Sequence, residues 1–82
     1  SVNGVNAFWQ RLRELKLDSR ALCCLKIGAI GPATAASLAD KSITADYMPD
    51  VYTGAGVIAG LKRYKVAGQR FLLPRADIAD TL

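Results

Sequence analysis

The chain has 82 residues, of which 51% are hydrophobic and 22% are charged, and its formal net charge is +4. This composition is typical of one small globular domain and not of a disordered or fibrous chain. No apolar run approaches the roughly 18 residues of a membrane span, so we expect no membrane partner. The sequence has no histidine, which excludes a Ser-His-Asp triad and leaves no plausible ligand set for zinc.

The first predicted element is an amphipathic helix. Asn3 is placed to cap its start, and Asp18 and Ser19 are placed to end it. We expect Trp9 to lie in the core and not against a ligand. The apolar residues recur at helical spacing and predict one buried face; they are Val5, Phe8, Trp9, Leu12 and Leu15.

Three segments predict strands. Residues 25–30 form an apolar run interrupted by Lys26, which is typical of a strand covered on both faces of a parallel sheet. Residues 43–49 predict a second strand that ends at Pro49. Residues 70–73 predict a third.

Helices are predicted between and after these strands, over residues 33–40 and 53–65 and from Pro74 onward. Strands that alternate with helices at this spacing indicate an α/β fold with a parallel sheet. The chain begins at Ser1 without a methionine and ends inside the fourth predicted helix. We therefore interpret residues 1–82 as part of one α/β domain of a longer protein.

The adjacent pair Cys23 and Cys24 offers little chemistry by its pattern. Neighbouring cysteines rarely form a disulfide, because the geometry is strained. We interpret both as small apolar residues just before a strand. Reduced cysteines also fit a cytoplasmic protein.

The predicted ends of the strands carry the candidate site, because ligands of an open parallel sheet bind beyond the carboxyl ends of its strands. Free backbone N–H groups at the start of the following helix can hold an anion there. The clearest example is the tight turn at Gly31 and Pro32, between a strand and a helix. The candidate binding residues are Ser1, Asn3, Gly31, Ala33, Thr34, Tyr52, Thr53 and Arg75.

Several of these positions also have a structural interpretation. Thr53 fits a helix cap better than a ligand contact, whereas Thr34 fits a local hydrogen bond and a ligand contact equally well. Gly54 and Gly56 mark either a loose first helical turn or a place where a ligand meets the backbone. Arg75 follows an apolar strand and a proline, and we assign it to the ligand because guanidinium binds carboxylate in a bidentate manner.

Other ligand classes lack their motifs. The sequence has neither a G-x-G-x-x-G fingerprint nor a phosphate loop with Gly-Lys-Ser/Thr. Its basic residues are scattered without interleaved aromatic residues, so we expect no nucleic-acid partner. A mild positive charge equally fits a polyanionic small molecule. From the residues alone, a non-catalytic α/β ligand-binding or regulatory domain for such a molecule stays open.

Four segments, in this order, give the chain a resemblance to the uroporphyrinogen-III synthase family over nearly all of its length. They are SVNGVNAFWQRL, LKIGAIGPATAASL, ADYMPDVYTGAGVIAGL and GQRFLLPRADIADTL. The resemblance implies the interior of the second of two flavodoxin-like domains, a three-layer sandwich of which three strands and four helices would lie in this chain. It also implies an enzyme of porphyrin and heme biosynthesis, a hydro-lyase that closes hydroxymethylbilane into uroporphyrinogen III and inverts the last pyrrole ring.

The resemblance also carries expectations about the site. Ser1 matches the serine of the family's Thr-Ser-x-x-x-Val turn, and Thr34 matches the threonine that follows Gly-x-Ala. The third helix often starts as Thr-Ala-Glu-Gly-Leu, whereas residues 53–57 read TGAGV and lack the glutamate. The tyrosine often named as proton donor would follow Leu82, so no catalytic residue is assigned here. The family implies a monomeric enzyme without cofactor or metal, acting on a tetrapyrrole with several carboxylates, and we expect this chain alone to be inactive.

Overall fold

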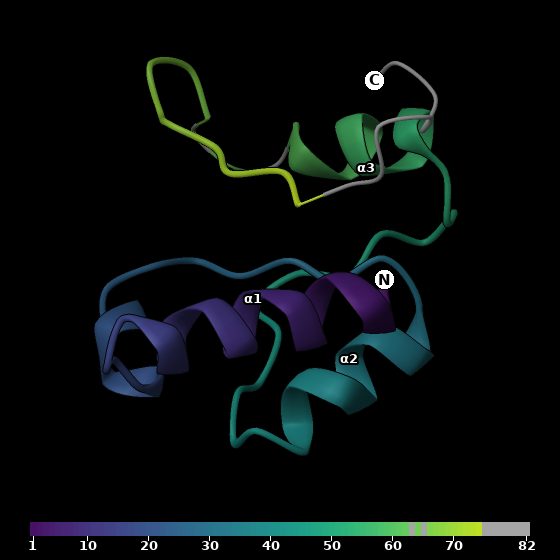
Figure 1. Cartoon of the computed structure of the whole chain (residues 1–82). Coiled ribbons are helices and arrows are strands. Elements are labelled where there is room, and N and C mark those ends of the chain that lie inside the picture. The colour runs from purple at the N-terminus through teal and green to yellow at the C-terminus, as the bar shows by residue number, and fades with distance from the viewer. Residues whose placement is uncertain (63, 65, 75–82) are drawn as a thin grey trace.

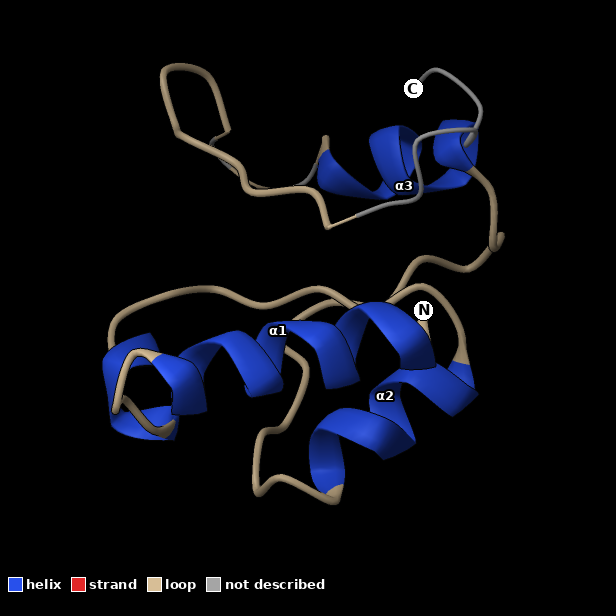
Figure 2. Cartoon of the chain, viewed as in Figure 1, coloured by secondary structure: helices blue, strands red, loops and turns tan. Residues whose placement is uncertain are grey.

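The computed structural model describes residues 1–62, 64 and 66–74. Figure 1 shows two helices side by side, α1 and α2, with α3 reached through the loop that follows α2. Loops join the helices throughout the described part of the chain (Figure 2). No described helix is long and apolar enough to cross a bilayer. The described helices are α1 (Val2–Glu14), the short 3-10 helix η1 (Ser19–Leu22), α2 (Pro32–Ala39) and α3 (Gly54–Leu61).

The predicted first helix exists, but both of its ends differ from the prediction. Ser1 caps it in place of Asn3, because Ser1 Oγ accepts a hydrogen bond from the Gly4 N–H at 3.0 Å. The helix ends at Glu14, ahead of the predicted stop at residues 18–19, since Lys16 takes a φ of 58°. The Leu17 N–H then donates to the Leu12 carbonyl at 2.8 Å, the bond that closes a Schellman motif.

The described core is small and lies where α1 meets α2. Its buried hydrophobic residues are Leu12, Ala29 and Leu38. The far end of α2 is tied to α1 through Lys41, whose Nζ donates to Asn6 Oδ1 at 2.9 Å. The same ammonium lies 6.0 Å from the centre of the Trp9 ring, within reach of a cation–π contact. Trp9 therefore helps to join the two helices.

The predicted α/β sandwich with a parallel, flavodoxin-like sheet is wrong for this structure, because no strand forms among the described residues. Residues 25–30 and 43–49 meet at one isolated parallel bridge, between Gly28 and Tyr47. In that bridge the Ala29 N–H donates to the Tyr47 carbonyl at 2.9 Å. The two segments are neighbours, but they do not form a ladder.

Two residues of the second segment explain why the bridge does not extend. The next bond of a parallel ladder would require an N–H at residue 49, and Pro49 has none. In the other direction, the Ile27 N–H already donates to the Asp46 carboxylate at 2.7 Å. A side chain thus occupies the donor that the previous bond of the ladder would have used.

Two predictions for the C-terminal part of the chain differ from the structure. Residues 70–73 form an exposed irregular segment and not the predicted third strand. The predicted helix 53–65 is shorter, since α3 ends at Leu61. The fourth predicted helix, and with it Arg75, lies outside the described residues. Cys23 and Cys24 are exposed, so their interpretation as apolar residues before a strand is also wrong.

Helix α3 packs against the segment that precedes it. The Tyr47 hydroxyl donates to the Val57 carbonyl at 3.0 Å. A Cβ atom added at Gly56 would overlap the Val51 carbonyl, and one added at Gly60 would overlap the Tyr47 hydroxyl. The backbone at Gly56 is closely approached, but by Val51 of the same chain, so the structure does not support the interpretation that a ligand meets the backbone there.

Candidate functional site

Four of the predicted site residues lie at the start of α2, namely Gly31, Ala33 and Thr34 with Tyr52 beside them. Gly31 is its N-cap residue, is buried, and has a φ of 95°, which favours glycine. A methyl group on Gly31 would lie 4.0 Å from Cδ2 of Tyr52. Tyr52 is 54% exposed, so its ring stands beside this helix start with much of its surface open.

No side chain caps α2, which sets it apart from the other described helices. Pro32 has no N–H, and the first N–H that finds a helical acceptor belongs to Ala35, which donates to the Gly31 carbonyl at 3.2 Å. Within the described part of the chain, the N–H groups of Ala33 and Thr34 therefore find no acceptor at the helix start. Ala33 is exposed, whereas Thr34 is 9% exposed. Two aligned donors of this kind can hold one carboxylate oxygen each.

The other predicted hydroxyl groups have structural roles. Ser1 Oγ accepts from the Gly4 N–H and Thr53 Oγ1 accepts from the Gly56 N–H, each at 3.0 Å. The prediction that Thr53 is a helix cap is confirmed. Asn3 is exposed in the first turn of α1.

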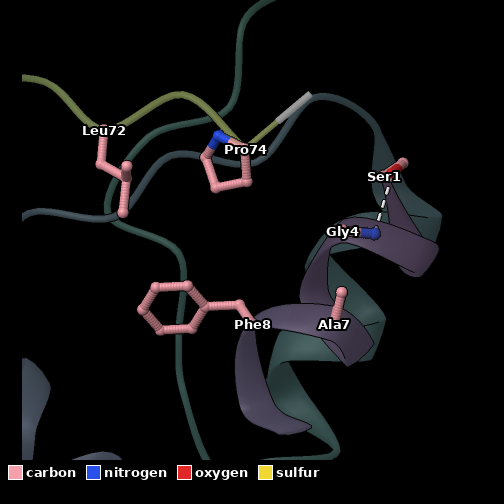
Figure 3. A pocket seen from close by; sticks show the side chains of 6 residues that line it. All are labelled: Ser1, Gly4, Ala7, Phe8, Leu72 and Pro74. Carbon is pink, nitrogen blue, oxygen red and sulfur yellow. Dashed lines mark hydrogen bonds between the residues drawn. The ribbon is translucent and has the colours of Figure 1, made fainter. Parts of the chain in front are cut away.

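An open hollow of about 370 Å³ lies beside the start of α1. In Figure 3, the Phe8 ring projects from α1 below Leu72 and Pro74 of the C-terminal segment, and Ser1 and Gly4 lie at the helix start. Sequence reasoning assigned Phe8 to the core and Leu72 to a strand, so it missed this apolar space. The small residues Gly4 and Ala7 on one side of the helix were the available signal.

No acidic side chain in the first turn compensates the positive end of the helix dipole at these helix starts. None of α1, α2 and α3 has an acidic residue in its first turn. An exposed local ion pair lies elsewhere, at the start of η1, where Arg20 donates to the Asp18 carboxylate through its side chain at 2.8 Å. These hydrogen bonds hold the pKa of Asp18 below its usual range and raise the pKa of Arg20.

Metal chemistry has little support in the described part of the chain. No group of three or more His, Cys, Asp or Glu side chains gathers there in a way that could hold a metal ion. The start of α2 instead offers backbone donors beside an aromatic ring, and these two groups can bind an anionic ligand that also has apolar rings. The apolar hollow beside α1 is lined by other residues.

Comparison with known proteins decides which family the chain represents. The family model of uroporphyrinogen-III synthase HemD matches residues 1–82. The chain belongs to this family. The resemblance found in the sequence is confirmed.

One curated relative is the porphyrin biosynthesis protein HemD of Ruminiclostridium josui. It is 30% identical over 80 residues, which make up 98% of this chain and 16% of that protein. The chain thus spans about 16% of the length of the relative it matches. No solved structure matches the chain.

Proposed function

We propose that this chain forms part of a uroporphyrinogen-III synthase and contributes one wall of its substrate cleft. The observation that carries the proposal is the family match, which covers every residue from 1 to 82. The relative is named as a porphyrin biosynthesis protein, which supports the same pathway. The enzyme would be a cytoplasmic lyase, and we expect the whole enzyme to act as a monomer.

The proposed substrate, hydroxymethylbilane, is an open chain of four pyrrole rings that carries eight carboxylates. Its cyclisation releases the terminal hydroxyl group as water, joins the two ends of the chain and inverts the last ring. Catalysis then depends largely on holding the flexible chain with its ends close together. A net charge of +4 and helix starts without acidic residues favour such a polyanion.

Within the chain, we assign the main substrate contact to the start of α2. The N–H groups of Ala33 and Thr34, together with the Thr34 hydroxyl, would bind one carboxylate, and the Tyr52 ring beside Gly31 would pack against a pyrrole. Ser1, Asn3, Thr53 and Arg75 complete the proposed binding set. Because the hydroxyls of Ser1 and Thr53 cap helices, their contribution would be to stabilise the helices around the site and not to contact the substrate themselves.

The direct test is product formation by the full-length polypeptide that carries this sequence. A coupled assay that supplies hydroxymethylbilane should yield uroporphyrinogen III, distinguished by chromatography from the type I isomer that forms spontaneously. The 82-residue chain alone should yield none, because it spans only 16% of its relative. Absence of type III product from a folded full-length polypeptide would refute the proposed function.

A second test addresses the binding residues. Thr34→Ala and Arg75→Ala should reduce turnover or substrate affinity more than Trp9→Phe, since Trp9 lies beside Lys41, which follows the C-terminal end of α2. Thermal unfolding of each variant separates loss of binding from loss of fold. Normal kinetics in both Thr34→Ala and Arg75→Ala, at unchanged stability, would show that the site is assigned wrongly.

A further inference from the structure

Cys23 and Cys24 lie in an exposed loop directly after η1, and the proposed synthase site uses neither of them. Both are free thiols, and both are exposed. Their Sγ atoms lie 3.6 Å apart, close enough for one thiol to donate a hydrogen bond to the other. The loop therefore presents two accessible sulfur atoms side by side.

The backbone of the loop accounts for this arrangement. Adjacent side chains of an extended segment point to opposite sides, which would separate the sulfurs. Cys24 instead has a φ of 69°, in the left-handed region, and the two side chains turn toward each other. Hydrogen bonds fix the turn on both sides, from the Cys23 N–H to the Arg20 carbonyl at 3.2 Å and from the Leu25 N–H to the Leu22 carbonyl at 3.1 Å.

The separation of the sulfurs fits chelation of a thiophilic centre. Two thiolates bound to one centre through bonds of about 2.3 Å, at an angle between about 90° for a pyramidal and about 109° for a tetrahedral centre, lie about 3.3–3.8 Å apart, and the observed Sγ–Sγ distance is 3.6 Å. The described residues provide no third Cys, His, Asp or Glu to complete a protein-only metal site. The fitting ligand therefore needs two sulfurs from the protein and brings its own remaining substituent.

We propose that Cys23 and Cys24 form a chelating site for trivalent arsenicals that carry one organic group. In water such a compound has two hydroxyl groups on arsenic. Each thiol replaces one hydroxyl, so two arsenic–sulfur bonds form, two arsenic–oxygen bonds break and two water molecules leave with the thiol protons. Arsenic stays trivalent and the sulfurs are not oxidised, so the step needs no other reactant.

The test uses the reduced full chain and phenylarsine oxide. Intact-mass spectrometry should show one arsenical bound per chain, together with the loss of both free thiols to alkylation. The adduct should survive an excess of 2-mercaptoethanol and should be removed by 2,3-dimercaptopropanol, because only a second dithiol can compete with a chelate. An adduct that the monothiol removes would overturn the proposal.

Variants separate chelation from the simple presence of thiols. Cys23→Ser and Cys24→Ser should each bind phenylarsine oxide at least about 100-fold more weakly, the low end of what linking two binding groups gains. The matched control combines Cys24→Ser with Ser42→Cys, which keeps two thiols but moves one to another exposed residue with a positive φ of 63°. Circular dichroism checks that its helix content is unchanged. Binding as tight as that of the original chain, in this control or in either single variant, would contradict the proposal.

Discussion

The described helices differ in whether a side chain accepts a hydrogen bond from the free N–H groups at their start. α1, η1 and α3 have side-chain caps, from Ser1, Asp18 and Thr53 respectively. The N-cap of α2 is Gly31, which has no side chain, and no other side chain in the described part of the chain replaces it. The three capped starts are satisfied by the chain itself, whereas the start of α2 leaves its donors to solvent or to a ligand. The difference separates helix starts that stabilise the fold from one that is free to bind.

The largest expected effect is a change in the free energy of unfolding at Gly56, with Gly4 for comparison. Each glycine lies three residues after the residue that caps its helix. Gly56→Ala should destabilise the chain by about 1–3 kcal/mol, because the new methyl group would overlap the Val51 carbonyl. Gly4→Ala is the matched control. Its methyl group would meet the Ser1 hydroxyl at 3.2 Å, a side-chain atom that can shift, and alanine favours a helix by up to about 1 kcal/mol.

Chemical denaturation of both variants measures this difference. Equal free energies of unfolding for Gly56→Ala and Gly4→Ala would show that α3 does not pack on the backbone at Val51. The same comparison bears on the Thr53 cap, because the N–H that Thr53 accepts belongs to Gly56.

The next effect tests the open start of α2 in the full-length enzyme. Ala33→Asp places a carboxylate in the first helical turn. Its interaction with the helix dipole stabilises the helix, but its negative charge repels an anionic ligand. Substrate affinity should fall roughly tenfold, the effect of about 1.4 kcal/mol of repulsion, while the free energy of unfolding stays equal or rises. Ala36→Asp is the control, because it adds the same charge at an exposed residue of the same helix beyond its first turn.

Isothermal titration with a porphyrinogen-like polycarboxylate gives the affinities, and the KM gives an independent measure. Opposite effects on binding and on stability would distinguish a ligand site from a purely structural helix start. If Ala33→Asp and Ala36→Asp weakened binding equally, the effect would come from net charge, and α2 would lose its proposed role.

The capped starts should respond in the other way. Ser1→Ala and Thr53→Ala each remove the acceptor of one N–H, which costs about 1 kcal/mol of stability. Each variant should leave substrate affinity in the full-length enzyme nearly unchanged, provided that the helix still forms. Denaturation midpoints measure the first effect and titration measures the second. A large loss of affinity at small loss of stability would show that these hydroxyls contact substrate directly.

Local chemistry in the sequence was enough to predict part of this picture. The Gly31-Pro32 turn predicted the start of α2 to within one residue, since a proline fits the first helical position and a glycine accepts positive φ. The stop of α1 was out of reach, because it depends on a positive φ at Lys16, a residue with no particular preference for it.

The error in the sheet had a different cause. The segments around Gly28 and Tyr47 do pair, as their apolar character indicated, but the pairing stops after one bridge. Pro49 predicted the end of the second strand, but because it has no N–H, it also cannot donate to the segment around Gly28. The use of the Ile27 N–H by Asp46 depends on the register between the segments, which the pattern of a single segment does not contain. The neighbourhood of Gly31 and Tyr52 is likewise a tertiary fact.

The smallest effect concerns the capped start of η1 and its dependence on pH. The pKa of Asp18 lies below its ordinary value of 3.8, first because the Arg20 side chain donates hydrogen bonds to it and then because the Arg20 backbone N–H does so as well. A lowered folded-state pKa gives stability that is fully present above the unfolded-state pKa and is lost as the pH falls through the folded-state pKa. The contribution should be slight and should shrink with added salt, because both side chains are exposed.

Urea unfolding of Asp18→Asn and of the unchanged chain, measured above the unfolded-state pKa of Asp18 and below its folded-state pKa, tests this prediction. The two midpoints should converge at the lower pH, where neither chain has a charge at residue 18. A difference that instead grows as the pH falls would show that Asp18 does not act through its carboxylate, and that this helix start is held by the backbone alone.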